Sequence, residues 1–507
     1  MKNLFTILIS VFAFSGFAQD GTSDVTFGTN GIASLNFIGD DEHAATEVLP
    51  NGKILVLSET YSSLYGMLLP TVTRLNTDGS LDLSFGTNGS VAIQAITIWN
   101  NSYALTFDAQ NRPIVVLNGD DQLEVIRLLE NGTIDTDFDF DGRAIADLGP
   151  EQEHVTGVKV RPNGKIVLVC AYGLGFGAAQ FNSNGSLDNT FGVSGIISHT
   201  VLGTTNVFQG MALQDNGKIL VCGRTTFVWG KPMSIYRLNA DGSIDNTFDD
   251  DGVKHRLVGL DETFGYEVHV YPDGKTLVAG LAKYSSTERR GFLAAFDVDG
   301  SGYDMFGSTD IVTLNLSGGL DWFTTLTVQN DGKILAAGHF NYANPVTDVG
   351  FWAVRFNADG TLDPTFSNDG SVVTYLPGRN VFIEDMCLTP EGDVILGARN
   401  VLTTSADSDM ALLKLTAGLA VSITESNTVD FNIYPNPTSE ALIVNLAELN
   451  GNNASIRVVD ALGKEVISTS DVKGNNTTLN VNHLVKGTYF GTVTSGSETG
   501  SFQFVKN

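Results

Sequence analysis

Cationic residues are scarce in this chain of 507 residues. Lys and Arg together number 29, whereas Asp and Glu number 57, so the formal net charge is −28 at pH 7. Binding to nucleic acid or to an anionic lipid surface requires a basic face, so this balance argues against both partners. Charged residues of both signs make up only 17% of the chain, below the roughly 25% of ordinary soluble domains.

Cysteine is scarce as well. The chain has three cysteines, Cys170, Cys222 and Cys387, and they lie far apart in the sequence. An odd number at such distances does not indicate a disulfide framework. Cys170 and Cys222 fall in apolar strand patterns, so we expect buried thiols that pack as small hydrophobic side chains.

Long apolar runs are absent after the N-terminus. Lys2 precedes the mostly apolar segment 4–14, which is shorter than the ~20 residues needed to span a bilayer. Small residues at positions 16 and 18 predict cleavage between Ala18 and Gln19. Residues 1–18 are therefore expected to be a secretory signal peptide, and the mature protein is expected to be exported without a transmembrane segment.

Glycine is abundant, with 55 residues, and many glycines belong to a repeat that fills residues 20 to about 416. Its first element is an Asn-Gly or Asp-Gly turn followed by an apolar strand, as in PNGKILV at 50–56 and PNGKIVL at 162–168. This combination predicts a β-hairpin whose two central turn residues both adopt φ > 0. Similar segments follow at 215–221, 272–278 and 330–336; weaker copies stand at 110–116, where Arg112-Pro113 replaces Gly-Lys, and at 390–396.

The second element of the repeat is a polar turn closed by phenylalanine, as in NADGSIDNTF at 239–248. The closing residues are Phe27, Phe85, Phe138, Phe191, Phe248, Phe306 and Phe366. A recurrent Asp in this turn is expected to cap the turn itself; the copies are Asp82, Asp135, Asp188, Asp245 and Asp363. An apolar strand precedes each complete turn, so each repeat holds about four short strands.

Four antiparallel strands repeated seven times predict an all-β, seven-bladed β-propeller over residues 19–417. An open array or another blade number is the alternative. The repeats begin just after the signal peptide with a strand that follows the Phe turn, and they end with a strand that normally precedes it. One blade is therefore expected to be shared between the two chain ends of the ring, with its inner strand supplied by the N-terminal residues, which would remove two free sheet edges.

Residues 430–507 differ in pattern from the repeats and follow a polar linker at 418–429. Their apolar residues alternate with polar ones, and glycine turns separate the segments. This period of two predicts a small antiparallel β-sandwich.

Both regions resemble known families. The repeats are similar to the delta-60 family, which implies a propeller-like exported protein and no particular enzymatic activity. The C-terminal region resembles the type A sorting domain of the Bacteroidetes type IX secretion system at Tyr434, Pro435, Asn436, Pro437, Gly487, Tyr489 and Lys506. This second resemblance implies the type IX machinery as a partner and a secreted or cell-surface location.

Two of the four connections in each repeat vary strongly in length and sequence. In an antiparallel blade both lie on the same face, which we call the variable-loop face; the near-uniform turns lie on the opposite face, the repeated-turn face. Function is concentrated on loops held by such a scaffold. Exposed aromatics beside carboxylates suit sugar rings or protein partners, so we expect ligand contacts from Trp99, Trp229, Trp322 and Tyr342.

Two classes of function follow. The first is a non-catalytic, monomeric protein that binds a glycan or a surface protein. The alternative is a glycan-active hydrolase or lyase that uses Asp261, Glu262, Glu151 or Glu153. The first is favoured, because no blade has a dense polar cluster and no Ser/His/Asp spacing or paired-His metal motif occurs.

No cofactor or metal is expected, although Asp-rich turns leave a calcium requirement open. An acidic rim around the central channel is expected from Asp40, Asp41, Glu42, Glu151, Glu153, Asp261, Glu262 and Asp321.

Overall fold

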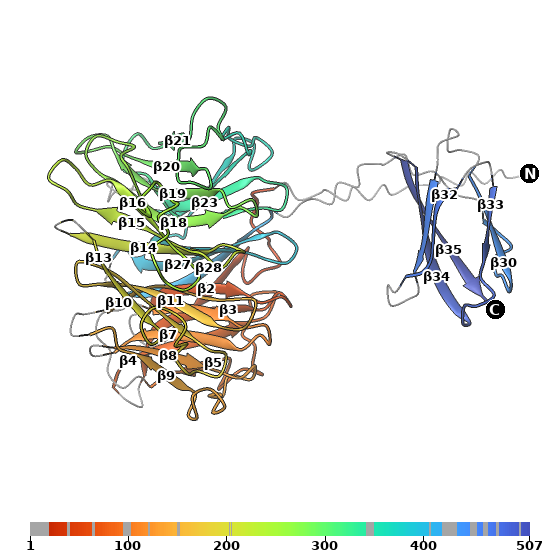
Figure 1. Ribbon diagram of the computed structural model, residues 1–507, viewed down its shortest axis with the longest axis horizontal. Coiled ribbons are helices and arrows are strands. Elements are labelled where there is room, and N and C mark those ends of the chain that lie inside the picture. Colours follow the sequence, from red (N-terminus) through yellow and green to blue (C-terminus); the bar gives the residue numbers. More distant parts are fainter. Residues whose placement is uncertain are drawn as a thin grey trace, which may run out of the picture. The chain divides into compact units, whose positions relative to one another are not determined.

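The computed structural model describes residues 20–37, 41–62, 66–94, 103–119, 122–149, 153–201, 203, 205–340, 349–404, 407–417, 433–446, 454–459, 465–472, 476–495 and 498–507. The regular elements in these segments are all β-strands (Figure 1). No helix in them could cross a membrane. The chain divides into two compact units, Met1–Gly418 and Leu419–Asn507.

The first unit contains seven four-stranded antiparallel sheets. The first strand of each sheet leads into the Asn-Gly or Asp-Gly turn: β2 (Glu42–Val48), β6 (Tyr103–Phe107), β10 (Glu153–Val160), β14 (Asn206–Leu213), β18 (Thr263–Val270), β22 (Trp322–Val328) and β26 (Arg379–Leu388). The second strand leaves that turn: β3 (Ile54–Ser62), β7 (Pro113–Asn118), β11 (Ile166–Tyr172), β15 (Ile219–Thr225), β19 (Thr276–Lys283), β23 (Ile334–His339) and β27 (Val394–Leu402).

The outer half of each sheet flanks the Phe turn. The third strands precede it: β4 (Met67–Leu75), β8 (Leu123–Arg127), β12 (Gly175–Phe181), β16 (Met233–Leu238), β20 (Arg289–Phe296), β24 (Phe351–Phe356) and β28 (Ser408–Leu415). The fourth strands follow it: β5 (Ser90–Ala92), β9 (Arg143–Ala146), β13 (Ile196–Thr200), β17 (Val253–Arg256), β21 (Ile311–Leu314), β25 (Ser371–Thr374) and, for the sheet of β26, the N-terminal β1 (Ile32–Leu35).

The first strands are the inner strands of a propeller. Each contacts the first strand of the next sheet along the chain, and β26 contacts β2. In Figure 1 the blue-green β27 and β28 accordingly lie beside the red-orange β2, although they come from opposite ends of this unit. All seven inner strands line one cavity.

The N-terminal strand is the outermost strand of its sheet, so the prediction that it would be an inner strand is wrong. The sheet order is β1-β28-β27-β26, and β1 pairs only with β28, with Ile32 opposite Leu413 and Leu35 opposite Met410. No strand of this sheet follows β28 in the chain, so the outer edge of β28 would be unpaired without β1. Pairing with β1 covers that edge. Phe27 and Leu35 then pack with Ile54 in one buried cluster.

The hairpin turns also differ from the prediction. Gly52 adopts φ 79°, and the preceding Asn51 is not among the residues with positive φ. Leu49 N–H donates to Lys53 O, and Gly52 N–H donates to Leu49 O. Only the glycine position therefore requires left-handed backbone, as in hairpin loops that end with an αL residue.

The weaker repeat copy near residue 111 follows the same turn geometry. Asn111 (φ 58°) takes the place of the glycine. Arg112 takes the place of the lysine, because its guanidinium pairs with Asp135, just as Lys53 pairs with Asp82. In the structure, Asn111-Arg112 therefore takes the place of Gly-Lys. The alignment of the repeats had instead placed Arg112-Pro113 there, one residue later.

Hydrophobic side chains fill the space between adjacent sheets of the first unit. The seven closing phenylalanines are buried; six of them are fully inaccessible, and Phe306 is 7% exposed. Cys170 and Cys222 are fully buried in this core, as the sequence predicts. Cys387 is only partly buried and lines the central cavity.

The second unit consists of two antiparallel sheets that share one hydrophobic core. One sheet has the order β29 (Ile433–Tyr434), β30 (Ala441–Asn445) and β33 (Asn476–Asn480). The other has the order β32 (Glu465–Val472), β31 (Ala454–Val459), β34 (Gly487–Ser495) and β35 (Glu498–Lys506). Leu442 and Val444 of the first sheet belong to the same buried cluster as Ile456 and Phe504 of the second.

Candidate functional site

The inner strands enclose a channel of about 1100 Å³. Six of the seven carry a β-bulge at the same level; the register shifts lie between His43 and Ala45, Val155 and Gly157, Phe208 and Gly210, Gly265 and Glu267, Phe323 and Thr325, and Ile383 and Asp385. A bulge inserts one residue and redirects the side chains beside it. In β18 and β26 the residue that resumes the register after the bulge is Glu267 or Asp385, and both line the channel.

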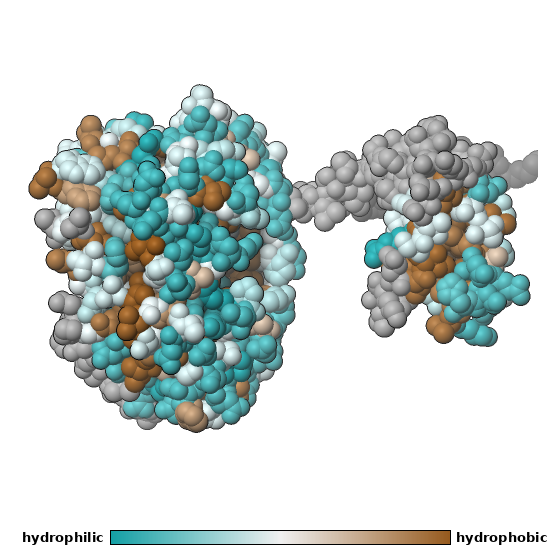
Figure 2. Space-filling model, viewed as in Figure 1, coloured by the Kyte–Doolittle hydropathy of each residue, from teal (hydrophilic) through white to brown (hydrophobic). Residues whose placement is uncertain are grey.

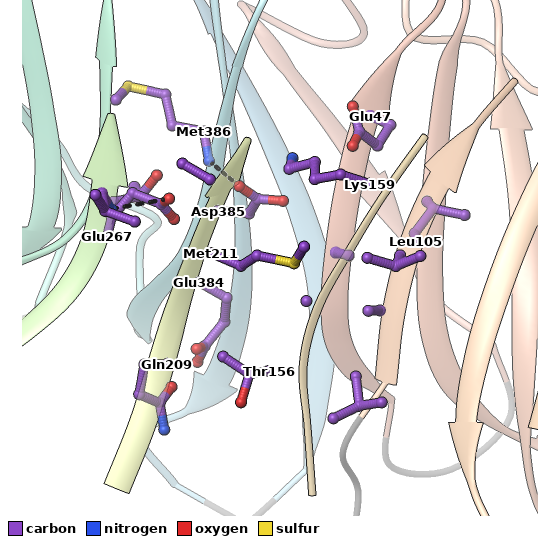
Figure 3. Close-up of a pocket in the computed structure, with 18 of the residues that line it drawn as sticks. Glu47, Leu105, Thr156, Lys159, Gln209, Met211, Glu267, Glu384, Asp385 and Met386 are labelled. Atoms are coloured by element: carbon purple, nitrogen blue, oxygen red, sulfur yellow. Dashed lines mark hydrogen bonds between the residues drawn. The ribbon is translucent and has the colours of Figure 1, made fainter. Parts of the chain in front are cut away.

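Five acidic or basic residues line the channel: Glu47, Lys159, Glu267, Glu384 and Asp385. Figure 3 shows Lys159 and Asp385 extending from different strands into the same space. Asp385 accepts hydrogen bonds from Thr46 N–H (2.9 Å) and Met386 N–H (2.7 Å). Glu267 accepts one from Val268 N–H at 3.1 Å.

Burial deep in the ring shifts the titration of these groups. Burial raises the pKa of Glu47 to about 7, against the attraction of Lys159. Burial likewise raises the pKa of Glu267 to about 7. Glu47 is the main cause that raises the pKa of Lys159 above its ordinary value. The channel thus holds the Lys159 ammonium close to buried carboxyls whose pKa values are raised.

A smaller pocket of about 370 Å³, the mouth pocket, adjoins this channel toward the variable-loop face. Its walls include Tyr266, Trp322, Phe382, Glu384 and Arg399. Gln209, Glu267 and Glu384 line both spaces. The Arg399 guanidinium lies 5.1 Å from the centre of the Phe382 ring, and burial raises the pKa of Glu384 to about 7 although Arg399 opposes the shift. The mouth pocket therefore combines aromatic faces with groups that donate and accept hydrogen bonds.

Two of the four aromatic residues predicted to contact a ligand, Trp322 and Trp229, are described by the structure, and they lie in different places. Trp322 is only 8% exposed and stacks on His339 at 4.6 Å between ring centres, so it forms a wall of the mouth pocket. Trp229 is 58% exposed on a variable loop and stacks on Phe227 at 5.0 Å. Trp229 does not line the mouth pocket. Trp99 and Tyr342 lie outside the described residues.

Much of the predicted acidic rim serves to hold loops instead. Asp41, Glu153 and Asp321 are buried and accept hydrogen bonds from the backbone amides of Phe37, Leu148 and Leu316, which precede the inner strands. In these three blades, a buried carboxylate at the start of the inner strand thus accepts a hydrogen bond from the backbone that precedes the strand.

The other predicted acids have different environments. Glu262 pairs with Arg224, and Asp261 pairs with Lys283 at 3.1 Å. Glu42 lies 3.9 Å from Arg399 of the mouth pocket. Asp40 and Glu151 lie outside the described residues.

Sequence reasoning missed Glu47, Lys159, Glu267, Glu384 and Asp385. The signal was a charged residue inside the apolar strand just before the Asn-Gly or Asp-Gly turn, as in EVLPNGK and KVRPNGK. Strand alternation places such residues on one face. That face lines the channel, and it could be recognised only once these strands were known to be the inner ones.

The predicted sorting residues converge on the C-terminal strand β35. Asn436 donates to Gln503 O at 3.0 Å and accepts from Val505 N–H at 2.9 Å. Tyr434-Pro435 and Asn436-Pro437 are cis peptide bonds. Gly487 pairs with Lys506, while the buried Tyr489 donates its hydroxyl to Val485 O at 2.9 Å. The predicted cleavage pair, Ala18 and Gln19, lies outside the described residues.

Comparison with protein families assigns both units. The Secretion system C-terminal sorting domain matches residues 432–507. The Domain of unknown function (DUF5122) beta-propeller matches residues 49–85, 161–191, 214–248 and 329–366. The chain is a β-propeller protein with a type IX sorting tail. The tail interacts with the type IX machinery, and the protein is secreted or attached to the outer cell surface.

Three of the solved structures that match this propeller protein show a distant likeness to it. A family PL25 ulvan lyase is 10% identical, with a TM-score of 0.47, 76% of this chain covered and 96% of that one. The propeller domain of the Trilobed protease from Pyrococcus furiosus is 9% identical, with a TM-score of 0.42 and coverage of 76% and 100%. Sqt1 from Chaetomium thermophilum is 13% identical, with a TM-score of 0.42 and coverage of 76% and 99%. No curated protein matches the chain.

Proposed function

We propose that this chain is an exported, non-catalytic β-propeller that binds a glycan in the mouth pocket on its variable-loop face. The observation that carries the proposal is the pocket of about 370 Å³ in which Trp322, Tyr266 and Phe382 stand beside Glu384 and Arg399. Aromatic faces pack against sugar rings, and a few placed polar groups fix the orientation of a ligand.

The architecture that supports this function is a closed, monomeric ring of seven blades over residues 19–417. Seven four-stranded sheets and the contact between β26 and β2 support closure. A linker at 418–429 would follow, and residues 430–507 would form a β-sandwich around the single core of the second unit. The proposal involves no cofactor.

A protein partner is the second candidate, and the loop around Trp229 favours it. Val228 and Trp229 are strongly exposed, and Leu260 on the adjacent connection is 69% exposed. Lys231 N–H donates to Asp261 O at 2.8 Å, which holds the two connections together. Figure 2 shows apolar surface at several points along the left side of this unit. Exposed apolar groups of this kind mark protein interfaces.

The enzymatic alternative is supported by two carboxyls that line the mouth pocket, Glu384 and Glu267, because burial raises the pKa of each to about 7. Glu384, with its raised pKa, could act as a general acid in the mouth pocket. A glycosidase also needs a second carboxyl at a separation of roughly 5–10 Å. Among the acids first considered, Glu153 is buried and Glu262 is ion-paired.

A glycan-array screen of the secreted chain tests the proposal, with calcium and with a chelator. We expect selective capture of one polysaccharide class, weakened at least tenfold by Arg399→Gln and unchanged by Trp229→Ala. If Trp229→Ala abolished glycan capture while Arg399→Gln retained it, the glycan would bind at the loop that carries Trp229 and not in the mouth pocket. Release of new reducing ends or unsaturated products from the captured glycan would show that the protein is an enzyme, and an empty array would reject the glycan assignment.

A further inference from the structure

Six of the seven blades hold a cationic side chain beside the Phe turn on the repeated-turn face. In four of them it is an arginine of the third strand, whose Nε donates to the turn Asp; the pairs are Arg74–Asp82, Arg127–Asp135, Arg237–Asp245 and Arg355–Asp363, at 2.6–2.7 Å. Each guanidinium also stacks 4.6–4.9 Å from the centre of the closing Phe ring. Its Nη1 reaches a carbonyl of the adjacent turn, from Glu130, Ser183, Val298 and Ala417 respectively.

Two further blades fill this niche in other ways. In the blade of β10–β13 the third strand has Gln180 instead of arginine, and Arg161 enters from the hairpin turn. Arg161 Nε donates to Gln180 at 2.6 Å, and its Nη2 reaches Ala240 O, the counterpart of the Glu130 carbonyl, at 3.4 Å. In the blade closed by β1, Lys414 lies 2.9 Å from Asp24. The niche thus holds a cation even when the strand arginine is missing.

The blade of β18–β21 is the exception. Ala295 stands where the other strands have arginine, Tyr303 stands where the turn has Asp, and Tyr271 stands where Arg161 enters its own blade. The result is a cavity of about 420 Å³ lined by Ala295, Tyr303, Tyr271 and Ala358, among others. Ala358 is the counterpart of Glu130 and Ala240, whose carbonyls accept the guanidinium elsewhere.

The charge around this cavity suits an incoming cation. Lys275 is already neutralised, because its ammonium lies 2.6 Å from Asp273 and 4.6 Å from the centre of the Tyr303 ring. Asp359 supplies a second carboxylate in the wall. Two tyrosine rings also line the space, and aromatic faces attract cations.

We infer that this cavity is a binding site for a guanidinium group, such as an exposed arginine side chain of a peptide or protein partner. The ligand group would take the place that the protein's own arginine occupies in the sister blades. The site lies on the repeated-turn face, opposite the mouth pocket, so it is independent of the proposed glycan site and its test can fail or succeed separately.

The test uses the full secreted chain and three blocked tripeptides, Gly-X-Gly, with arginine, citrulline or lysine as X. Ligand-observed NMR titration measures each affinity. We expect the arginine peptide to bind at least tenfold more tightly than the citrulline peptide, which keeps the shape but lacks the charge, and more tightly than the lysine peptide. Equal binding of arginine and citrulline peptides, or no binding of the arginine peptide, would overturn the inference.

Variants locate the site. Ala295→Arg restores the sister-blade residue and should reduce binding of the arginine peptide at least tenfold, whereas Leu260→Arg adds the same charge at an exposed position on the other face and should leave it unchanged. Asp359→Asn removes one wall carboxylate while keeping the oxygen that accepts from Thr361 N–H at 3.0 Å, and should weaken binding about threefold or more. Asp359→Asn still tests the site if the Ala295→Arg variant does not fold. Binding that persists in both cavity variants would show non-specific attraction to an acidic chain.

Discussion

Replacing Asp245 with asparagine should destabilise the propeller by about 3 kcal/mol. Asp245 Oδ2 accepts from Arg237 Nε at 2.6 Å and from Lys218 Nζ at 2.5 Å. The side chains of Asp245 and Arg237 are only 3% and 4% exposed. Removing one partner of a buried ion pair leaves the other charge uncompensated, which costs roughly 3–5 kcal/mol. Asparagine keeps the oxygen that caps Thr247, so we expect the lower end of this range.

The pH dependence of this effect follows from the pKa of Asp245. Burial alone would raise this pKa, but hydrogen bonds from Lys218, Thr247 and Arg237 outweigh it and hold the pKa well below its ordinary value. A carboxyl with a depressed folded-state pKa stabilises the fold fully above its unfolded pKa and loses that contribution as the pH falls. The gap between wild type and Asp245→Asn should therefore be full at pH 7 and should narrow below about pH 4.

Urea unfolding followed by tryptophan fluorescence measures the effect at pH 7 and at pH 3. With about 400 residues in the propeller and an unfolding entropy near 2.1 cal/mol/K per residue, 3 kcal/mol corresponds to a fall in Tm of about 4 °C. The control is Asp241→Asn: the exposed Asp241 carboxylate accepts hydrogen bonds from Ser243 N–H and Oγ, and its replacement should change stability by less than about 1 kcal/mol. A cost below 1 kcal/mol for Asp245→Asn, or one that does not depend on pH, would refute the reasoning.

Two further predictions concern the channel and the tail. The pKa of Glu267 is raised to about 7 in the folded state, so ionisation of this carboxyl destabilises the fold as the pH rises from 4.5 through 7. In urea unfolding, Glu267→Gln should therefore be roughly 1–2 kcal/mol more stable than wild type at pH 8 and equal to it at pH 4. The same difference in stability at both pH values would contradict this reasoning. Deleting residues 430–507 should retain the protein in the periplasm, as measured by cell fractionation, whereas efficient surface display of the shortened chain would refute the role of the tail.

The sequence alone determined the local elements of this protein. Asn-Gly and Asp-Gly turns between apolar runs mark hairpins because their geometry depends on a few adjacent residues. The closing phenylalanines recur at regular intervals in the sequence, and all of them are buried in the structure. The sorting tail was recognisable from Tyr434 to Pro437 and from Lys506, and these residues meet at β35.

Only the tertiary structure decided which strand of each repeat faces the channel. Both edge strands of an antiparallel sheet have one free edge, so the repeat pattern does not distinguish inner from outer. Charged residues such as Glu47 and Lys159 acquire their role from this choice. The turn Asp was correctly predicted to cap its turn, since Asp245 accepts from Thr247, but its ion pair with Arg237 was not apparent from the sequence.

Recognising the cavity of the β18–β21 blade requires both the sequence and the tertiary structure. The substitutions at Ala295 and Tyr303 are visible when the repeats are aligned, yet their meaning depends on four segments that meet only in the folded chain: the hairpin turn, the third strand, its Phe turn and the Phe turn of the next blade. A sequence comparison shows that an arginine is missing. The packing shows that its place remains open, because the neighbouring blade still supplies the wall that the guanidinium contacts elsewhere.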